Sequence, residues 1–178
     1  MDQTYQPVIR PATPDDAEML SELAWRLFDE TFVSDGFRVP YPADDLAAFR
    51  EDSYGVTATR RRLENPAHWW EIAELDGRGV AYSEVGPASM PHPDLSPGHR
   101  ELKRLYVSRE AQGFGIGTRL LDRALAHMGQ TPGPQWLSVW SGNEKAQKLY
   151  AHHGFKKVGE YGYPVGAWRD HEFIFRRG

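Results

Sequence analysis

Apolar and polar residues alternate along this chain in blocks that predict the order of its helices and strands. Residues 5–12 predict a strand, and residues 13–32 predict an amphipathic helix in which leucines recur at helical spacing. We expect this helix to begin with Thr13 as its N-cap and Pro14 at its first position. A second helical region follows over residues 42–64 and is interrupted near Tyr54–Gly55.

Strand-like runs dominate the middle of the chain. Residues 68–75 and 80–86 flank a turn that contains Asp76–Gly77, and this arrangement predicts a β-hairpin. Residues 86–100 are rich in proline, which cannot pair within a central strand, so we expect a loop there. Residues 101–107 predict the next strand.

The last third of the chain alternates between helix and strand. The predicted segments are helix 116–128, strand 136–140, helix 143–153 and strands 155–163 and 168–177. This order predicts an α/β (α+β) fold with a mixed central sheet of about seven strands flanked by helices. Two strand–helix–strand steps imply parallel pairing through right-handed crossovers. A length of 178 residues fits one domain, residues 1–178.

Composition excludes several classes of chemistry. The chain has no cysteine, which excludes disulfides, thiolate metal sites and cysteine nucleophiles. Among its seven histidines only His152 and His153 are close in sequence, and adjacent helical residues point about 100° apart, so we expect no metal. The net charge of −4 argues against nucleic acid as a partner. The polar N-terminus and the lack of an apolar run of ~20 residues predict no membrane segment and a cytoplasmic protein.

A glycine-rich loop at residues 112–118 lies between a predicted strand and a predicted helix. Its glycines, at 113, 115 and 117, fit neither the dinucleotide fingerprint nor the P-loop, which needs a lysine after its last glycine. Backbone N–H groups at a helix N-terminus nevertheless favour an anion, most often a phosphate. The alternative is that these glycines only form a tight turn.

Two blocks of sequence resemble one family. The pattern Gln112-x-x-Gly115-x-Gly117 after a Leu-Tyr-Val strand resembles the acetyl-CoA signature of the GCN5-related N-acetyltransferases (GNAT). Residues 136–155 resemble the family's next block, with these residues at the family's spacing: Asn143, Ala146, Tyr150, Gly154 and Phe155. The resemblance covers about residues 100–160 and implies the GNAT-type acyl-CoA N-acyltransferase fold. Within the family, the chain looks most like the branch of bacterial polyamine (spermidine/spermine) acetyltransferases.

The resemblance implies acetyl-CoA as the acetyl donor and assigns residues to it. The pantetheine arm is expected to pair with the backbone of Leu105, Tyr106 and Val107. Asn143 is expected to hold the cofactor, to cap its helix, or both. The pyrophosphate is expected on the amides of seven residues: Gln112, Gly113, Phe114, Gly115, Ile116, Gly117 and Thr118. Gln112 is alternatively an ordinary solvated loop residue.

The implied chemistry needs a base and an acid. An alkylamine with a pKa near 10.4 must lose a proton before it attacks, which costs roughly 4–5 kcal/mol at neutral pH. Glu101 and Glu84 are the candidate bases, and either one is alternatively a solvated carboxylate at a strand end. Tyr150 matches the family's helix tyrosine and is the candidate acid for the departing thiolate. It also lies on an apolar helix stripe and is alternatively a core residue.

Because the chain has no cysteine to carry an acyl group, we expect direct transfer from acetyl-CoA to the acceptor. The expected acceptor is a small molecule with a primary amine, and a polyamine is the first choice. A protein or peptide amine and an aminoglycoside remain open, and a non-catalytic acyl-CoA-binding regulator of the same fold is the rival interpretation. Many relatives are dimers, so the resemblance implies a homodimer.

Overall fold

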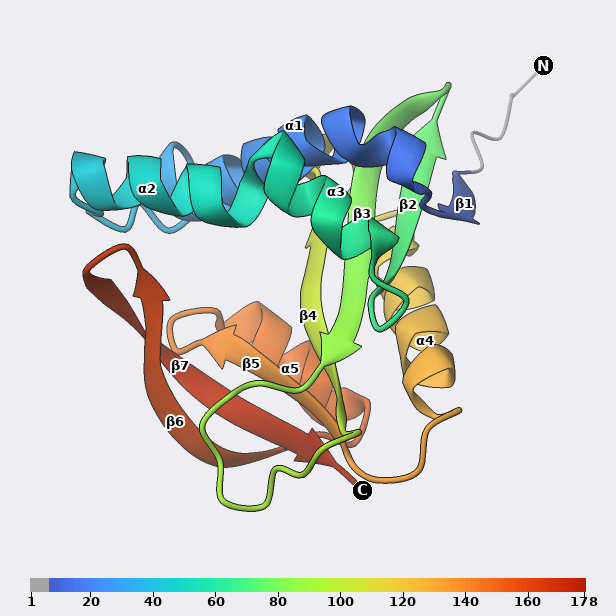
Figure 1. Cartoon of the computed structure of the whole chain (residues 1–178), viewed down its shortest axis with the longest axis vertical. Coiled ribbons are helices and arrows are strands. Elements are labelled where there is room, and N and C mark those ends of the chain that lie inside the picture. Colours follow the sequence, from blue (N-terminus) through green and yellow to red (C-terminus); the bar gives the residue numbers. More distant parts are fainter. Residues whose placement is uncertain (1–6) are drawn as a thin grey trace.

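One mixed sheet of seven strands forms the centre of the computed structural model, which describes residues 7–178 (Figure 1). The strands are β1 (Val8–Pro11), β2 (Trp69–Leu75), β3 (Arg78–Pro87), β4 (Arg100–Val107), β5 (Gln135–Trp140), β6 (Lys156–Val165) and β7 (Trp168–Arg177). Their order is β1-β2-β3-β4-β5-β7-β6, and the neighbours β4 and β5 are parallel. The predicted fold class is confirmed. Residues 5 and 6 of the predicted first strand lie outside the described residues.

Helices cover both faces of the sheet (Figure 1). They are α1 (Ala17–Phe28), α2 (Ala43–Tyr54), α3 (Val56–Glu64), α4 (Ile116–Met128) and α5 (Glu144–His152). The first three pack with Trp70 and Tyr82 of the sheet in one apolar cluster. Helices α4 and α5 pack with Val85 and Leu102 in another. No helix within residues 7–178 is long and apolar enough to cross a membrane.

The first predicted helix is not α-helical throughout. It begins with a 3₁₀ turn at Pro14–Asp16, and α1 passes into a π-helical turn at Asp29–Val33. The Thr31 hydroxyl donates to the Leu27 carbonyl at 2.6 Å, and such bonding back to the helix carbonyls bends helices.

The β2–β3 hairpin forms as predicted. Its turn residues Asp76 and Gly77 have φ angles of 51° and 73°, as a two-residue type I′ turn requires. Strand β3 continues to Pro87, so Glu84 lies inside the strand and not at its end.

The parallel pairing predicted from the two strand–helix–strand steps forms at one of them. The step β4–α4–β5 gives a parallel pair, but β5 and β6 are not neighbours. Strands β6 and β7 form a hairpin, and β7 returns between β6 and β5, antiparallel to both. The turn of this hairpin contains Gly166, whose φ is 60°.

A buried ion pair fastens α4 to the sheet. Glu71 on β2 is fully buried, and Arg123 of α4 donates from Nε to its carboxylate oxygens at 2.7 and 2.8 Å. The Arg123 side chain is about half exposed. The buried carboxylate therefore depends on a partner that approaches from the surface.

We predict that Arg123→Ala destabilises the protein by roughly 2 kcal/mol, because it leaves the Glu71 carboxylate buried without a partner. This is less than the cost of about 3–5 kcal/mol for fully buried pairs, since Arg123 is partly solvated. Urea denaturation measures the change. Adding Glu71→Gln removes the unpaired charge and should restore part of the loss; a double variant less stable than the single one contradicts the argument.

Candidate active site

Strands β4 and β5 separate part-way along their length and leave one edge of β4 open. They pair only at Arg100–Leu102 with Gln135–Leu137. Beyond Leu102, within the described chain, β4 is paired with β3 alone. This open edge contains Leu105, Tyr106 and Val107, the residues predicted to pair with pantetheine. An extended chain that carries amides can add to such an edge as a strand does.

The glycine loop follows the open edge directly. Gly113 and Gly115 have φ angles of 87° and 72°, in the left-handed region, and α4 begins at the next residue. The Gln112 side chain donates to the Val107 carbonyl at 3.3 Å and so ties the loop to β4. The N–H groups of residues 116–118 lie in the first turn of α4, where a helix has no acceptor of its own, and none of residues 113–115 is a donor among the backbone hydrogen bonds outside helices and strands of residues 7–178. The loop thus offers unpaired donors at the positive end of a helix, which suits a pyrophosphate.

A cavity of about 560 Å³ opens beside β4. Its lining comes from both helix layers, and includes Tyr54 of α2 and Tyr150 of α5. It therefore reaches through the gap between β4 and β5. The three predicted catalytic residues, Tyr150, Glu101 and Glu84, all line it, as do Leu105, Tyr106 and Asn143. The loop residues 112–118 are not part of its lining and lie beyond the end of β4.

Tyr150 keeps its proton at neutral pH. Burial raises the pKa of its hydroxyl to about 12, and the negative charge of Glu172 adds to the effect, so it stays protonated at neutral pH. The ring also packs against Phe155, with centroids 6.1 Å apart, so the core interpretation holds together with exposure to the cavity. Asn143 caps α5 by accepting from the Ala146 N–H at 3.1 Å. Its contact with a cofactor stays a prediction.

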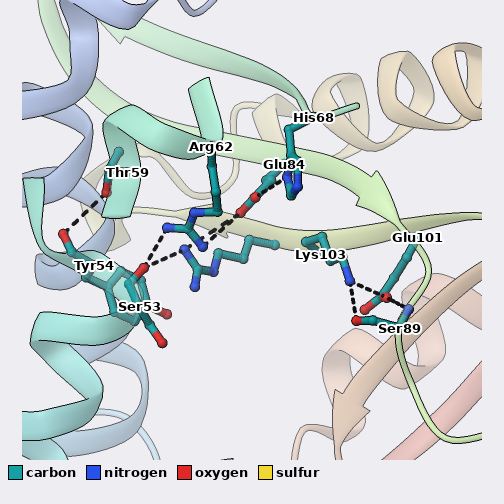
Figure 2. Close-up of polar contacts among 10 residues, drawn as sticks. Ser53, Tyr54, Thr59, Arg62, His68, Glu84, Ser89, Glu101 and Lys103 are labelled. Atoms are coloured by element: carbon teal, nitrogen blue, oxygen red, sulfur yellow. Dashed lines mark hydrogen bonds and ion pairs between the residues drawn. The ribbon is translucent and has the colours of Figure 1, made fainter. Parts of the chain in front are cut away.

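Glu84 lies among cations. His68 Nδ1 is 2.9 Å from the Glu84 Oε1. The guanidiniums of Arg62 and Arg104 are 3.8 and 3.7 Å from the Glu84 Oε2 (Figure 2, where Glu84, His68 and Arg62 are labelled). Burial would raise the pKa of Glu84, but the His68 hydrogen bond and the two positive charges outweigh it and lower that pKa. A carboxylate held in its ionised form is a weak proton acceptor. Its surroundings therefore favour a role as counter-charge.

One carboxylate oxygen of Glu101 accepts hydrogen bonds from the protein, and the other is open to the cavity. Its Oε2 accepts from the Ser89 N–H at 3.0 Å and from Lys103 Nζ at 2.6 Å (Figure 2). Its Oε1 has no hydrogen-bond partner in the part of the chain that the structure describes. Glu101 can therefore accept a proton or a hydrogen bond from a molecule in the cavity.

Comparison with known proteins identifies the family. Residues 18–155 match the model of the acetyltransferase (GNAT) family. The chain belongs to this family. An uncharacterized N-acetyltransferase of Lactobacillus delbrueckii subsp. lactis is 24% identical, over 83% of this chain and 86% of the relative.

Solved structures of other acetyltransferases share the fold. The PaiA N-acetyltransferase of Thermoplasma acidophilum, in complex with coenzyme A, has a TM-score of 0.71 at 20% identity and covers 97% of this chain and 98% of its own. A ribosomal-protein-alanine N-acetyltransferase from Brucella melitensis has a TM-score of 0.63 at 21% identity, covering 96% of this chain and 98% of its own.

In this GNAT acetyltransferase, sequence reasoning missed a carboxylate that the structure places in the cavity. Glu172 lies on β7, opposite Trp140 of β5 and Tyr161 of β6. Burial raises its pKa to about 7; the negative charges of Asp170 and Glu101 add to this, while the Ser138 hydroxyl opposes it. The alternation of side chains along β7 could have indicated this position. Asp170 and Glu172 share a face of the strand with the buried Ile174, so they face inward.

Sequence reasoning also missed Arg62 and Arg104. Nothing in a basic run such as Arg60–Arg62 separates a buried arginine from a solvated one. Within residues 7–178 no group of three or more His, Cys, Asp or Glu side chains is placed to hold a metal ion.

We predict that Glu172→Gln stabilises this acetyltransferase at pH 8.5 and changes its stability little at pH 5. The folded-state pKa of Glu172 is raised to about 7, above its value in the unfolded chain. Between these two pKa values the carboxyl is protonated in the folded state and ionised in the unfolded state. The stability of the wild type therefore falls as the pH rises through this window. The gain at pH 8.5 should reach about 2–3 kcal/mol.

Urea denaturation at the two pH values measures this difference. Glu51→Gln, on the exposed surface of α2, is the matched control and should show none. Equal effects of Glu172→Gln at both pH values would show that its pKa is unshifted.

Proposed function

We propose that this acetyltransferase moves the acetyl group of acetyl-CoA directly to the primary amine of a small molecule. The observation that carries the proposal is the open edge of β4, which leads from the unpaired amides of the glycine loop to the cavity that holds Tyr150. The coenzyme A complex of the Thermoplasma relative supports the same donor.

The described residues suit acetyl-CoA. Amides from Gln112 to Thr118 would bind the pyrophosphate, and the backbone of Leu105–Val107 would pair with the amides of pantetheine. Acetyl-CoA supplies a thioester, whose carbonyl carbon the amine attacks. The acetyl end then lies beside the cavity, where the acceptor enters.

The cavity side chains move the protons. An ammonium acceptor gives one proton to Glu172 or to the open oxygen of Glu101, directly or through water, and becomes a neutral nucleophile. Its nitrogen forms the new N–C bond as the C–S bond breaks. The departing thiolate takes a proton from Tyr150, and the second proton released by the nitrogen restores it, so an ammonium and a thioester yield an amide, a thiol and one proton. The chain has no cysteine that could carry the acetyl group between the two substrates.

The identity of the acceptor stays a prediction. A polyamine is supported by the carboxylates of Glu101, Asp170 and Glu172 in the cavity lining. A protein or peptide amine is the alternative that the fold relationship to the Brucella enzyme supports. A cavity of about 560 Å³ is of the size that small ligands occupy, which favours the small molecule. The cytoplasmic location and the homodimer also stay predictions.

We predict that free thiol is released from acetyl-CoA only when an amine of the correct class is present. The panel contains spermidine, spermine, amino acids, lysine peptides and an aminoglycoside, and thiol release is followed spectroscopically. Release with one class supports the proposal and names that class. Binding of acetyl-CoA without release for any amine favours the regulator, and absence of binding overturns the donor site.

We predict that Tyr150→Phe lowers kcat by about 10²-fold and leaves the Kd for acetyl-CoA unchanged. The phenol donates its proton only as the thiolate departs, whereas the ring, which Phe keeps, maintains the packing with Phe155. Steady-state kinetics and calorimetric titration measure the two quantities. An unchanged kcat would assign Tyr150 to the core alone.

A further inference from the structure

Two arginines and one glutamate form a buried cluster with unequal charge. Arg62 of α3 and Arg104 of β4 flank Glu84, and the three side chains are 20%, 9% and 1% exposed. Even with His68 neutral, the cluster carries one positive charge in excess. An uncompensated buried charge is costly, so this cluster calls for a further anion.

Neighbouring groups compensate this charge only in part. Both guanidiniums donate to the Ser53 carbonyl at the end of α2, at 2.6 Å from Arg62 and 3.2 Å from Arg104. The rings of Tyr54 and Trp70 lie 4.3 Å from Arg104 and 5.3 Å from Arg62. These are dipoles and π faces, not anions. Burial and the charge of Arg104 lower the pKa of Arg62, as expected for two cations that repel each other.

The cluster keeps unused hydrogen-bonding capacity. Arg62 Nε and Glu84 Oε2 are buried, and neither has a hydrogen-bond partner within the described residues. Over the same residues, Arg104 donates to Ser53 alone and lines the cavity. Figure 2 shows Arg62 between Ser53 and Glu84, well apart from the separate group formed by Glu101, Lys103 and Ser89. Five N–H donors in a rigid fork match the oxygens of a carboxylate or a phosphate.

The carboxylate end of the cavity is marked by Glu101, which Figure 2 shows apart from Arg62 and which is paired with Lys103. Glu172 and Asp170 also line the cavity. Glu101 and Arg104 are three residues apart, about 10 Å along a strand, so one small molecule can reach both. Residues three apart normally face opposite sides. A bulge at Lys103, between the pairs Glu84–Arg104 and Val85–Leu102, turns both side chains toward the same cavity.

We propose that the acceptor carries an anionic group, a carboxylate or a phosphate, which Arg62 and Arg104 bind while its amine lies at the carboxylate end of the cavity. This inference rests on the proposed acetyltransferase function and narrows its substrate class to amines that also bear an anion. It differs from the polyamine that the sequence favours, because a second ammonium would lie against the guanidiniums.

The test compares acceptors that differ only in the anion. The pairs are lysine and lysinamide, 4-aminobutyrate and butylamine, and O-phosphoethanolamine and ethanolamine; the third distinguishes a phosphate from a carboxylate. We expect kcat/KM to favour the anionic member of at least one pair by about 10²-fold. Equal rates for both members of every pair that reacts, or a preference for spermidine, overturn the inference and leave the acetyltransferase function intact.

A variant then assigns the preference to the arginines. Arg62→Gln should lower kcat/KM for the anionic acceptor by about 10²-fold and change that of its uncharged partner less than about threefold. Arg60→Gln removes the same charge from the same helix at a position outside the cavity lining, where Arg60 donates to the Pro14 carbonyl, and should preserve the preference. If Arg62→Gln fails to fold, Arg62→Lys replaces it in the test, because lysine keeps the positive charge but lacks the planar set of N–H donors of a guanidinium. Equal losses for both members of a pair would make Arg62 structural.

Binding provides a readout that does not need turnover. If no amine is acetylated, the proposed function fails, but the anion site can still be tested. The thermal shift of the protein is measured with N-acetylglycine and with inorganic phosphate, and N-acetylglycinamide is the uncharged control. We expect a Tm rise with an anion in the wild type and in Arg60→Gln, and none in Arg62→Gln. The absence of a rise with either anion in the wild type overturns the inference.

Discussion

The early separation of β4 from β5 is the constraint on which the rest of this structure depends. Two parallel strands that stayed paired would bury every backbone amide of β4 in the sheet. Here pairing ends at Leu102, and β4 continues to Val107 with one edge open. The gap joins the two helix layers, so α2 and α5 line one cavity. Strand β7 makes this arrangement stable, because it pairs along β5 from Gln135 to Trp140 on the other side.

Two buried carboxylates of the same sheet show the difference between a structural contact and a candidate binding surface. Glu71 accepts hydrogen bonds from both Nε and Nη2 of Arg123, and its charge is matched one for one. Two guanidiniums lie near Glu84 but beyond hydrogen-bond distance. Its Oε2 therefore has no hydrogen-bond partner within residues 7–178. The first pattern anchors a helix. The second leaves charge and donors for a molecule from outside.

Local patterns in the sequence were enough to predict most of the fold and to propose one half of the candidate site. The Asp76–Gly77 turn, the glycine loop and the helix stripes depend on neighbours within a few residues, so each could be predicted. The position of β7 between β5 and β6 could not, because it depends on a pairing between residues far apart in the chain. Arg62 belongs to a basic run, and its burial follows from how α3 packs on the sheet. Glu172 gave a weak signal, since strand periodicity places it inward but does not say what it faces.

Tyr150 and Glu172 show how one environment can prepare two opposite roles. Burial raises the pKa of both groups, to about 12 for the phenol and about 7 for the carboxyl. For the phenol this means that the proton is retained at neutral pH. For a carboxyl the same shift brings its pKa closer to that of an alkylammonium, which reduces the cost of taking the proton from it. The two groups also interact, because the charge of Glu172 contributes to the raised pKa of Tyr150. In the proposed mechanism, the Glu172 carboxylate helps to keep Tyr150 protonated until it takes the proton of the acceptor, after which its charge no longer opposes proton donation by Tyr150.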